Sequence, residues 1–296
     1  IAITKKSKNK INYVIWNFSS QEIDKLSDYL KSKFRQEKFK STEKKFSRTL
    51  KLESGKTTEN LPTDANIDEQ YFLFQDKEFY FGKITQIYNA KEQEKRDMSK
   101  PVRREELAIS PRLAKILINL SQVKESQVLV DPFCGIGVIL QEALLQNIKV
   151  IGIDKNEAVI QGCKTNLEWA NFSKNNYHLI NDDSTKVKIH SNINAIVTEP
   201  HLGILLKEIP TKQQAQKMLD EFETLIIKVL NNLKPQVKGR IVFTSPYIKI
   251  KEKKGTRLGC DINKIVRLTN LKSLNQFQDT RENQIVGREI IVLEKK

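Results

Sequence analysis

The chain has 296 residues, of which 39% are hydrophobic, so it is long enough for two domains that each bury a core. Its 51 Lys and Arg residues exceed its 36 Asp and Glu residues, and the formal net charge of +15 favours a polyanionic partner, although solubility alone would also account for it. No run of about 18 uncharged apolar residues is present, so the sequence predicts no transmembrane helix. Lysines close to Ile1 argue against a signal peptide.

The three cysteines, Cys134, Cys163 and Cys260, lie far apart, without a CxxC pair or a histidine cluster. We therefore expect neither a metal site nor a disulfide framework, and a reducing, cytoplasmic setting fits this cysteine usage. The chain starts with Ile rather than Met, which suggests that a longer protein has lost its beginning.

Residues 1–98 are rich in lysine, poor in glycine and show no parallel-sheet pattern. An amphipathic helix is predicted over residues 20–34, because apolar residues recur there at helical spacing. The basic stretch 35–51 is interpreted either as an RNA-contacting surface or as the solvated face of a helix, and the polar stretch 54–67 as a loop. Short strands are expected over residues 13–17, 71–74 and 78–88.

The charged residues 90–104 are predicted to form a connector between two domains. A helix then begins with Ser110 at the N-cap and Pro111 at the first helical position. Its apolar face should pack on a sheet just before the first strand of that sheet.

Residues 127–154, QVLVDPFCGIGVILQEALLQNIKVIGID, predict a βαβ unit of a doubly wound sheet. The first apolar strand ends at Asp131 and the second ends at Asp154. Ligands of such sheets bind beyond the carboxyl ends of the strands, where Asp154 can accept hydrogen bonds from ribose hydroxyls. The unit is predicted as a strand, a helix and a strand over residues 128–130, 138–146 and 149–153.

The turn between the first strand and the helix contains Gly135 and Gly137. Glycine lets the backbone pass close to a ligand, and the free N–H groups at the helix start favour negative or polar ligand groups. A dinucleotide-binding turn would show GxGxxG, but the third glycine is missing here. The string DPFCGIG instead resembles the first motif of S-adenosylmethionine (SAM) methyltransferases of class I.

The rest of the chain continues the alternation of strands and helices. The third strand ends at Asn181-Asp182-Asp183, and the fourth ends at Glu199-Pro200-His201-Leu202. The last two strands would form a reversed hairpin at the edge of the sheet. Helices are predicted over residues 157–170 and 212–233, and strands over 177–180, 194–198, 239–244, 271–277 and 288–293.

Stretches on both sides of the SAM motif carry a more specific resemblance: RDMSKP at 96–101, SPRLAKILINL at 110–120 and VGREIIVL at 286–293. Together with DPFCGIG they resemble the tRNA guanosine-10 N2-methyltransferase family, class I RNA methyltransferases with a THUMP domain before the catalytic domain. Related THUMP-linked rRNA guanine methyltransferases share much of the pattern. The resemblance implies a smaller α+β, THUMP-like RNA-binding domain over residues 1–98. It implies a Rossmann-like seven-stranded methyltransferase domain over 99–296.

The resemblance also implies the roles of individual residues. Asp154 would bind the ribose of SAM, and Asp183 would contact the adenine, with Asp182 as a close competitor. No metal is implied. The remaining SAM contacts would come from Asp131, Cys134, Gly135 and Gly137.

The catalytic residues implied are Glu199, Pro200 and His201, where the family usually has Asp-Pro-Pro-Tyr. In that motif the carboxylate and a backbone carbonyl accept hydrogen bonds from the target amine, and the aromatic residue stacks on the flipped base. Glu199 keeps the carboxylate, and His201 could stack on a base or lie on the surface as an ordinary histidine. Leu202 replaces the aromatic residue, which would lose about 1–3 kcal/mol of stacking.

The leading hypothesis is therefore a SAM-dependent methyltransferase acting on an exocyclic amine of guanosine in tRNA. A small activator protein is a further partner that the resemblance implies. The alternatives are methylation of rRNA guanine, methylation of a DNA amino group, and an inactive methyltransferase-like protein that binds RNA. Only the altered motif at 199–202 supports the last alternative.

Overall fold

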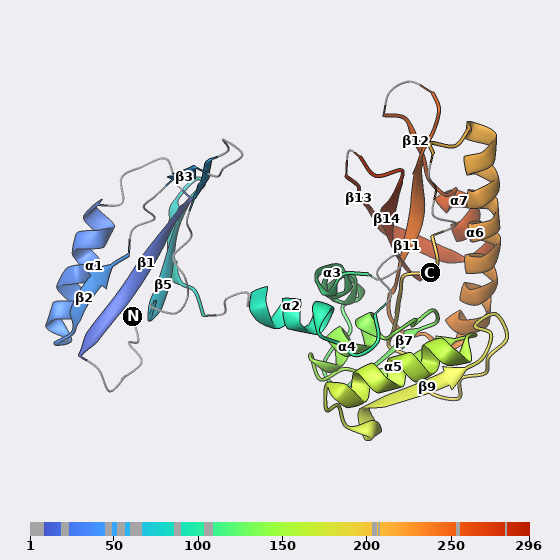
Figure 1. The fold of residues 1–296 in the computed structure, drawn as a ribbon, viewed down its shortest axis with the longest axis horizontal. Coiled ribbons are helices and arrows are strands. Elements are labelled where there is room, and N and C mark those ends of the chain that lie inside the picture. The colour runs from blue at the N-terminus through green and yellow to red at the C-terminus, as the bar shows by residue number, and fades with distance from the viewer. Residues whose placement is uncertain are drawn as a thin grey trace. The chain divides into compact units, whose positions relative to one another are not determined.

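The computed structural model describes residues 9–18, 24–44, 49–51, 57–59, 67–85, 90–103, 109–202, 206, 208–252, 255–281 and 283–296. The chain divides into two compact units, 1–89 and 90–296 (Figure 1). This division falls earlier than the predicted boundary after residue 98, because the first part of the predicted connector, residues 90–98, forms a helix. Helix α2 (Ala90–Met98) belongs to the second unit, where Arg96 Nε donates a 2.9 Å hydrogen bond to the buried Glu142.

The first unit contains a four-stranded sheet in the order β2-β1-β5-β6. Strand β1 (Lys10–Phe18) runs parallel to both β2 (Lys40–Glu43) and β5 (Glu69–Gln75), while β6 (Phe79–Lys83) is antiparallel to β5. The expectation of no parallel pairing was wrong, because β2 is polar throughout (KSTE) and the apolar runs of β1 and β5 are only four residues long, YVIW and YFLF, which does not distinguish parallel from antiparallel pairing. Strands β3 (Thr49–Lys51) and β4 (Thr57–Glu59) form a separate pair.

Helix α1 (Asp24–Gln36) packs its apolar side chains on one face of this sheet. Leu30 and Phe34 are fully buried against Tyr13 and Tyr71. The helix was predicted over residues 20–34, of which 20–23 lie outside the described residues. Residues 45–48 of the predicted basic stretch also lie outside them. In the described part of the basic stretch 35–51, only residues 35 and 36 belong to a helix. After α1 it contains a turn, β2 and β3, because Lys38 takes a left-handed conformation with φ of 61° that ends the helix.

The second unit is built on an eight-stranded mixed sheet. Seven strands follow the order β13-β14-β11-β10-β7-β8-β9, and the short β12 (Arg257–Leu258) pairs with β11. The predicted reversed hairpin is confirmed, since β14 is antiparallel to both β11 and β13. The strands are β7 (Val128–Asp131), β8 (Lys149–Asp154), β9 (Tyr177–Asn181), β10 (Ala195–Thr198), β11 (Ile241–Lys249), β13 (Leu271–Asp279) and β14 (Val286–Lys295).

Helices cover both faces of this sheet (Figure 1). Side chains alternate along each strand, so that in β10 Ala195 and Val197 join one core while Ile196 joins the other. One face carries α3 (Pro111–Ser121), α4 (Val138–Leu144) and α5 (Glu157–Trp169). The other face carries α6 (Lys212–Leu233) and α7 (Ile262–Thr269). Helix α7 was not predicted from the sequence.

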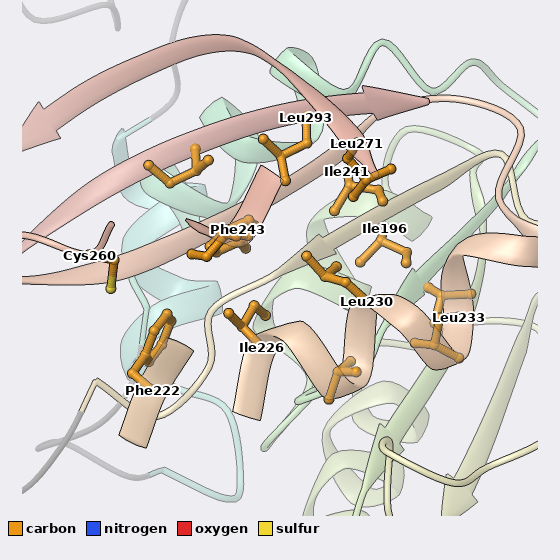
Figure 2. Close-up of a cluster of buried hydrophobic side chains, with 14 of the residues drawn as sticks. Ile196, Phe222, Ile226, Leu230, Leu233, Ile241, Phe243, Cys260, Leu271 and Leu293 are labelled. Carbon is orange, nitrogen blue, oxygen red and sulfur yellow. The ribbon is translucent and has the colours of Figure 1, made fainter. Parts of the chain in front are cut away.

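The core between α6 and the sheet is apolar and continuous (Figure 2). Figure 2 shows Ile226 and Leu230 of α6 pointing at Phe243 and Ile196 of the sheet. Each fully buried side chain of this size stabilises the fold by about 1.5–3 kcal/mol. The result is a rigid sheet whose parallel strands end at a common edge. The strand order reverses between β7 and β10, which is where ligands of doubly wound sheets bind.

Candidate functional site

The turn after β7 is shaped by its two glycines. Gly135 and Gly137 take φ values of +52° and +89°, a region that other residues rarely adopt. A Cβ on Gly137 would lie 2.6 Å from Cys163 Sγ, so this position also demands glycine for space. A Cβ on Gly135 would meet no atom within 4 Å. Open space beside Gly135 fits a ligand that approaches the backbone of the turn.

Cys134 is buried below the turn and points away from the open side. A Cβ built on Gly152 would come within 3.1 Å of its sulfur, and its backbone N–H donates to Ile153 O at 3.0 Å. A hydrogen bond with the neighbouring Cys163 and burial raise the pKa of the Cys134 thiol. The thiol is therefore neutral and part of the core, and a SAM contact of Cys134 stays a prediction.

Asp154 ends β8 beside the glycine turn. Its Oδ2 accepts a 3.2 Å hydrogen bond from Gly135 N, and its Oδ1 accepts one of 3.0 Å from Asn156 N. The carboxylate therefore joins the tip of β8 to the turn after β7. A half-buried carboxylate in this place can accept hydrogen bonds from ribose hydroxyls.

The two acids after β9 differ in their surroundings. Asp183 Oδ1 accepts hydrogen bonds from Thr185 N at 2.9 Å and Thr185 Oγ1 at 2.8 Å, and these bonds lower the pKa of Asp183. Asp182 is exposed, and its Oδ1 accepts a 2.7 Å hydrogen bond from Asp183 N. Asp183 is thus the more firmly held of the two, and its adenine contact stays a prediction.

Asp131 is the most deeply buried acid of the site, with 1% of its surface exposed. Its Oδ1 accepts hydrogen bonds from Thr198 Oγ1 at 2.6 Å and from Phe133 N at 3.1 Å. Burial raises the pKa of Asp131 to about 7, with smaller contributions in the same direction from Asp154 and Glu199. Such a carboxyl group would gain from a cationic ligand group.

Glu199 follows β10 at the same edge of the sheet, and Arg288 of β14 reaches it. Arg288 Nε donates a hydrogen bond to Glu199 Oε1. Among the described residues, nothing donates to Oε2, although this oxygen is buried. Burial raises the pKa of Glu199 while Arg288 lowers it. A buried acceptor without a donor is costly unless a ligand supplies one.

The rest of the fourth-strand motif leaves the sheet. Pro200 is buried, His201 is exposed, and Leu202 packs partly against the core beside α6. Leu202 therefore serves the core, and the family's aromatic position is not filled by it. Gly203 lies outside the described residues.

Two residues of the site, Thr198 and Arg288, were not predicted from the sequence. Thr198 was predicted only as the last residue of a strand, but its hydroxyl donates a hydrogen bond to Asp131. Arg288 read as part of the apolar string VGREIIVL, yet it pairs with Glu199 across 89 positions of sequence. The available signal was a charged pair, Arg288 and Glu289, within a predicted strand that is mostly apolar.

The residues present fit SAM. The molecule carries a sulfonium, an ammonium, a ribose and an adenine. Asp131 can face a cation, Asp154 can face hydroxyl groups, and the open space at Gly135 lets a ligand approach. No group of three His, Cys, Asp or Glu that could hold a metal ion occurs within the described ranges. No helix of the described part is long and apolar enough to cross a membrane.

Two family models match the chain. Residues 101–244 match the UPF0020 family, described as an RMKL-like methyltransferase domain. Residues 1–165, more than half of the chain, match the N6_N4_Mtase family, described as DNA methylase.

The chain is also similar to proteins described as tRNA (guanine(10)-N2)-dimethyltransferases. A tRNA (guanine(10)-N2)-dimethyltransferase of Methanothermobacter thermautotrophicus is 34% identical over 115 residues, which are 39% of this chain and 33% of that protein. The protein of the same description from Pyrococcus abyssi is 33% identical over 119 residues, with the same shares of both chains. The chain thus spans about a third of the length of the curated relatives it matches.

Among solved structures, TrmN from Thermus thermophilus is similar with a TM-score of 0.50 and 12% identity, covering 97% of this chain and 73% of that chain. The fold and the family matches define a class I SAM-dependent methyltransferase, and SAM is the cofactor of this class. Within the class, the chain belongs to the N6_N4_Mtase family, whose model covers more than half of it, and its residues 101–244 are similar to the UPF0020 methyltransferase domain.

Proposed function

We propose that the protein transfers a methyl group from SAM to an exocyclic amine of guanosine in tRNA. The observation that carries this proposal is Glu199 at the carboxyl edge of the sheet, whose buried Oε2 receives no hydrogen bond from any residue that the structure describes. A base amine placed there would donate one N–H to Oε2. SAM, when bound, supplies a methyl group activated by the positive sulfur.

The residues of the chain position the two reactants and favour the charge that develops on the amine. Glu199 directs the amine by accepting its hydrogen bond, and this bond strengthens as the nitrogen becomes positive. Asp131 would face a cationic group of the cofactor, Asp154 would hold the ribose and Asp183 would contact the adenine. Pro200 keeps the chain after Glu199 rigid, and the exposed His201 follows it in the same motif.

The first unit supports an RNA substrate. Phe18, Phe74 and Tyr80 are cross-strand neighbours in one row over β1, β5 and β6, and they are 63%, 45% and 50% exposed. Exposed aromatic rings on a sheet stack on unpaired bases, each stack contributing about 1–3 kcal/mol. The lysine-rich composition of the unit adds phosphate contacts. We therefore propose a THUMP-like RNA-recruiting role for this unit. The family resemblance adds two further proposals, a cytoplasmic setting and an activator protein as a partner.

Methylation of a DNA amino group is the second candidate, because residues 1–165 match a family described as DNA methylase. The same carboxylate would serve it, since adenine and cytosine also carry exocyclic amines. Methylation of rRNA guanine differs only in the RNA that is recruited.

The test is a methyl-transfer assay with tRNA, rRNA and duplex DNA, followed by mass spectrometry of the nucleosides. We expect N2-methylguanosine in tRNA. Glu199→Gln should lower turnover by roughly 10²–10³-fold, as loss of one preorganised electrostatic group does, with little change in SAM affinity. Glu221→Gln, an exposed position on α6, is the matched control. A wild-type protein that binds SAM and tRNA without transfer would favour the inactive RNA-binding alternative.

A further inference from the structure

We propose that Arg288 is a positioning residue for the methyl transfer: it turns the Glu199 carboxylate so that Oε2 stays vacant for the substrate amine. This inference rests on the proposed function. It assigns a role to β14, the antiparallel strand of the sheet, that none of the sequence motifs indicated.

The geometry of the pair is set by the sheet. Arg288 lies opposite Pro246 of β11 and opposite Asp279 of β13. Because β14 runs antiparallel, its first residues lie at the edge where the parallel strands end. The guanidinium thereby reaches the tip of β10, where Nε donates to Glu199 Oε1. Neither side chain is free to rotate into water, since Glu199 is 9% and Arg288 23% exposed.

The charges around Glu199 explain why an arginine is needed. Asp131 faces it from β7 and Asp279 from β13, and Arg288 is the cation that reaches it from β14. Burial and Asp279 raise the pKa of Glu199, and Arg288 lowers it. Without the guanidinium, this buried carboxyl group would take up a proton more readily, because the effect that lowers its pKa would be lost. A protonated Glu199 could no longer offer a charged acceptor to the amine.

The ion pair gives the two oxygens of the Glu199 carboxylate different surroundings. Arg288 occupies Oε1, while Oε2 is buried and has no donor among the described residues. Glu is one methylene longer than the Asp of the family's motif, so its carboxylate has one more torsion to fix. The hydrogen bond from Arg288 fixes this torsion and leaves one acceptor in a defined direction.

The test is a double-mutant cycle in the methyl-transfer assay, with Glu199→Gln, Arg288→Gln and both together. Arg288→Gln should lower kcat by roughly 10–100-fold, as misplacement of a reacting partner does. It should also move the acid limb of the kcat–pH profile to higher pH, because Glu199 then takes up its proton more readily. Arg288→Lys keeps the charge and should keep the acid limb near its wild-type place.

Because Arg288 acts through Glu199, the second substitution in the double variant should add little to the loss. Arg267→Gln, an exposed position on α7, is the control, and SAM affinity should be the same in all variants. Losses that multiply in the double variant would overturn the inference. So would equal losses for Arg288→Gln and Arg288→Lys with an unmoved acid limb, since this is the result for a merely structural arginine.

The same cycle in urea unfolding separates this inference from the proposed function. A wild-type protein without methyl transfer on any nucleic acid overturns the proposed function and the catalytic part of this inference. Coupling between residues 199 and 288 in unfolding would then still establish the ion pair. Transfer by the wild type together with additive losses of kcat overturns the role of Arg288 alone.

Discussion

Asp131→Asn should make the ligand-free protein more stable at neutral to alkaline pH while weakening SAM binding. The carboxyl group is buried, and its pKa is raised to about 7 from an ordinary value of 3.8. Between these two values the folded protein holds a proton that the unfolded chain releases. The free energy of unfolding therefore falls as pH rises from about 4 to about 7, and the cost is fully present above pH 7.

The size of the effect follows from the same pKa. Each tenfold change in an ionisation constant corresponds to about 1.4 kcal/mol, so the cost of ionising Asp131 is on the order of 4 kcal/mol at most. Asparagine is neutral and keeps an oxygen for the hydrogen bonds from Thr198 and Phe133. The variant should approach this gain in stability above pH 7 and lose it below about pH 5.

SAM binding should respond in the opposite sense. A charge-assisted hydrogen bond contributes about 1.5–3 kcal/mol, so loss of one should weaken binding roughly 30-fold above pH 7. Affinity of the wild type should also decline as pH falls below about 7, because Asp131 then holds its proton.

Urea unfolding across this pH range, followed by fluorescence of Trp169 in a Trp16→Phe background, measures the stability, and calorimetry measures SAM affinity. Asp220→Asn, at an exposed position on α6, is the control and should change neither quantity. An Asp131→Asn protein that is less stable than the wild type above pH 7, or that binds SAM equally well, would refute the reasoning.

Two further predictions concern the glycine turn and the first unit. Gly137→Ala should destabilise the protein by about 2–4 kcal/mol in urea, because its φ of +89° is strained for alanine and its Cβ would meet Cys163 Sγ; a Cys163→Ala background should recover part of this loss, and no recovery would contradict the clash. Phe74→Ala should weaken binding of single-stranded RNA by about 1–3 kcal/mol without changing SAM affinity. Unchanged RNA binding in a gel-shift titration would remove the aromatic row from the RNA-binding surface.

The second unit could be predicted almost element by element, because its parallel strands are short apolar runs that end in turn residues. The run before Asp131 and the run before Glu199 needed no tertiary information to be recognised. Helix α2 was missed because its charged sequence lacks an apolar face, and it is held instead by the bond of Arg96 to Glu142.

In the candidate site, too, some residues could be predicted from the sequence and others could not. The acids at strand tips follow from topology alone, since carboxyl ends of parallel strands share an edge. The partners of these acids do not follow, because Thr198 and Arg288 are recognised only when the register of neighbouring strands is known. The burial that raises the pKa of Asp131 is likewise a property of the packed sheet.

Because β14 is the last strand of the chain and pairs antiparallel with β11 and β13, the site is completed late during synthesis. Glu199 leaves the ribosome long before Arg288, and the sheet from β9 to β11 can assemble in the meantime. Until β14 inserts between β11 and β13, Glu199 at the tip of β10 lacks the hydrogen bond from Arg288. A nascent chain that ends before β14 should therefore carry an incomplete site. Such a chain should become competent for transfer only when this strand has docked.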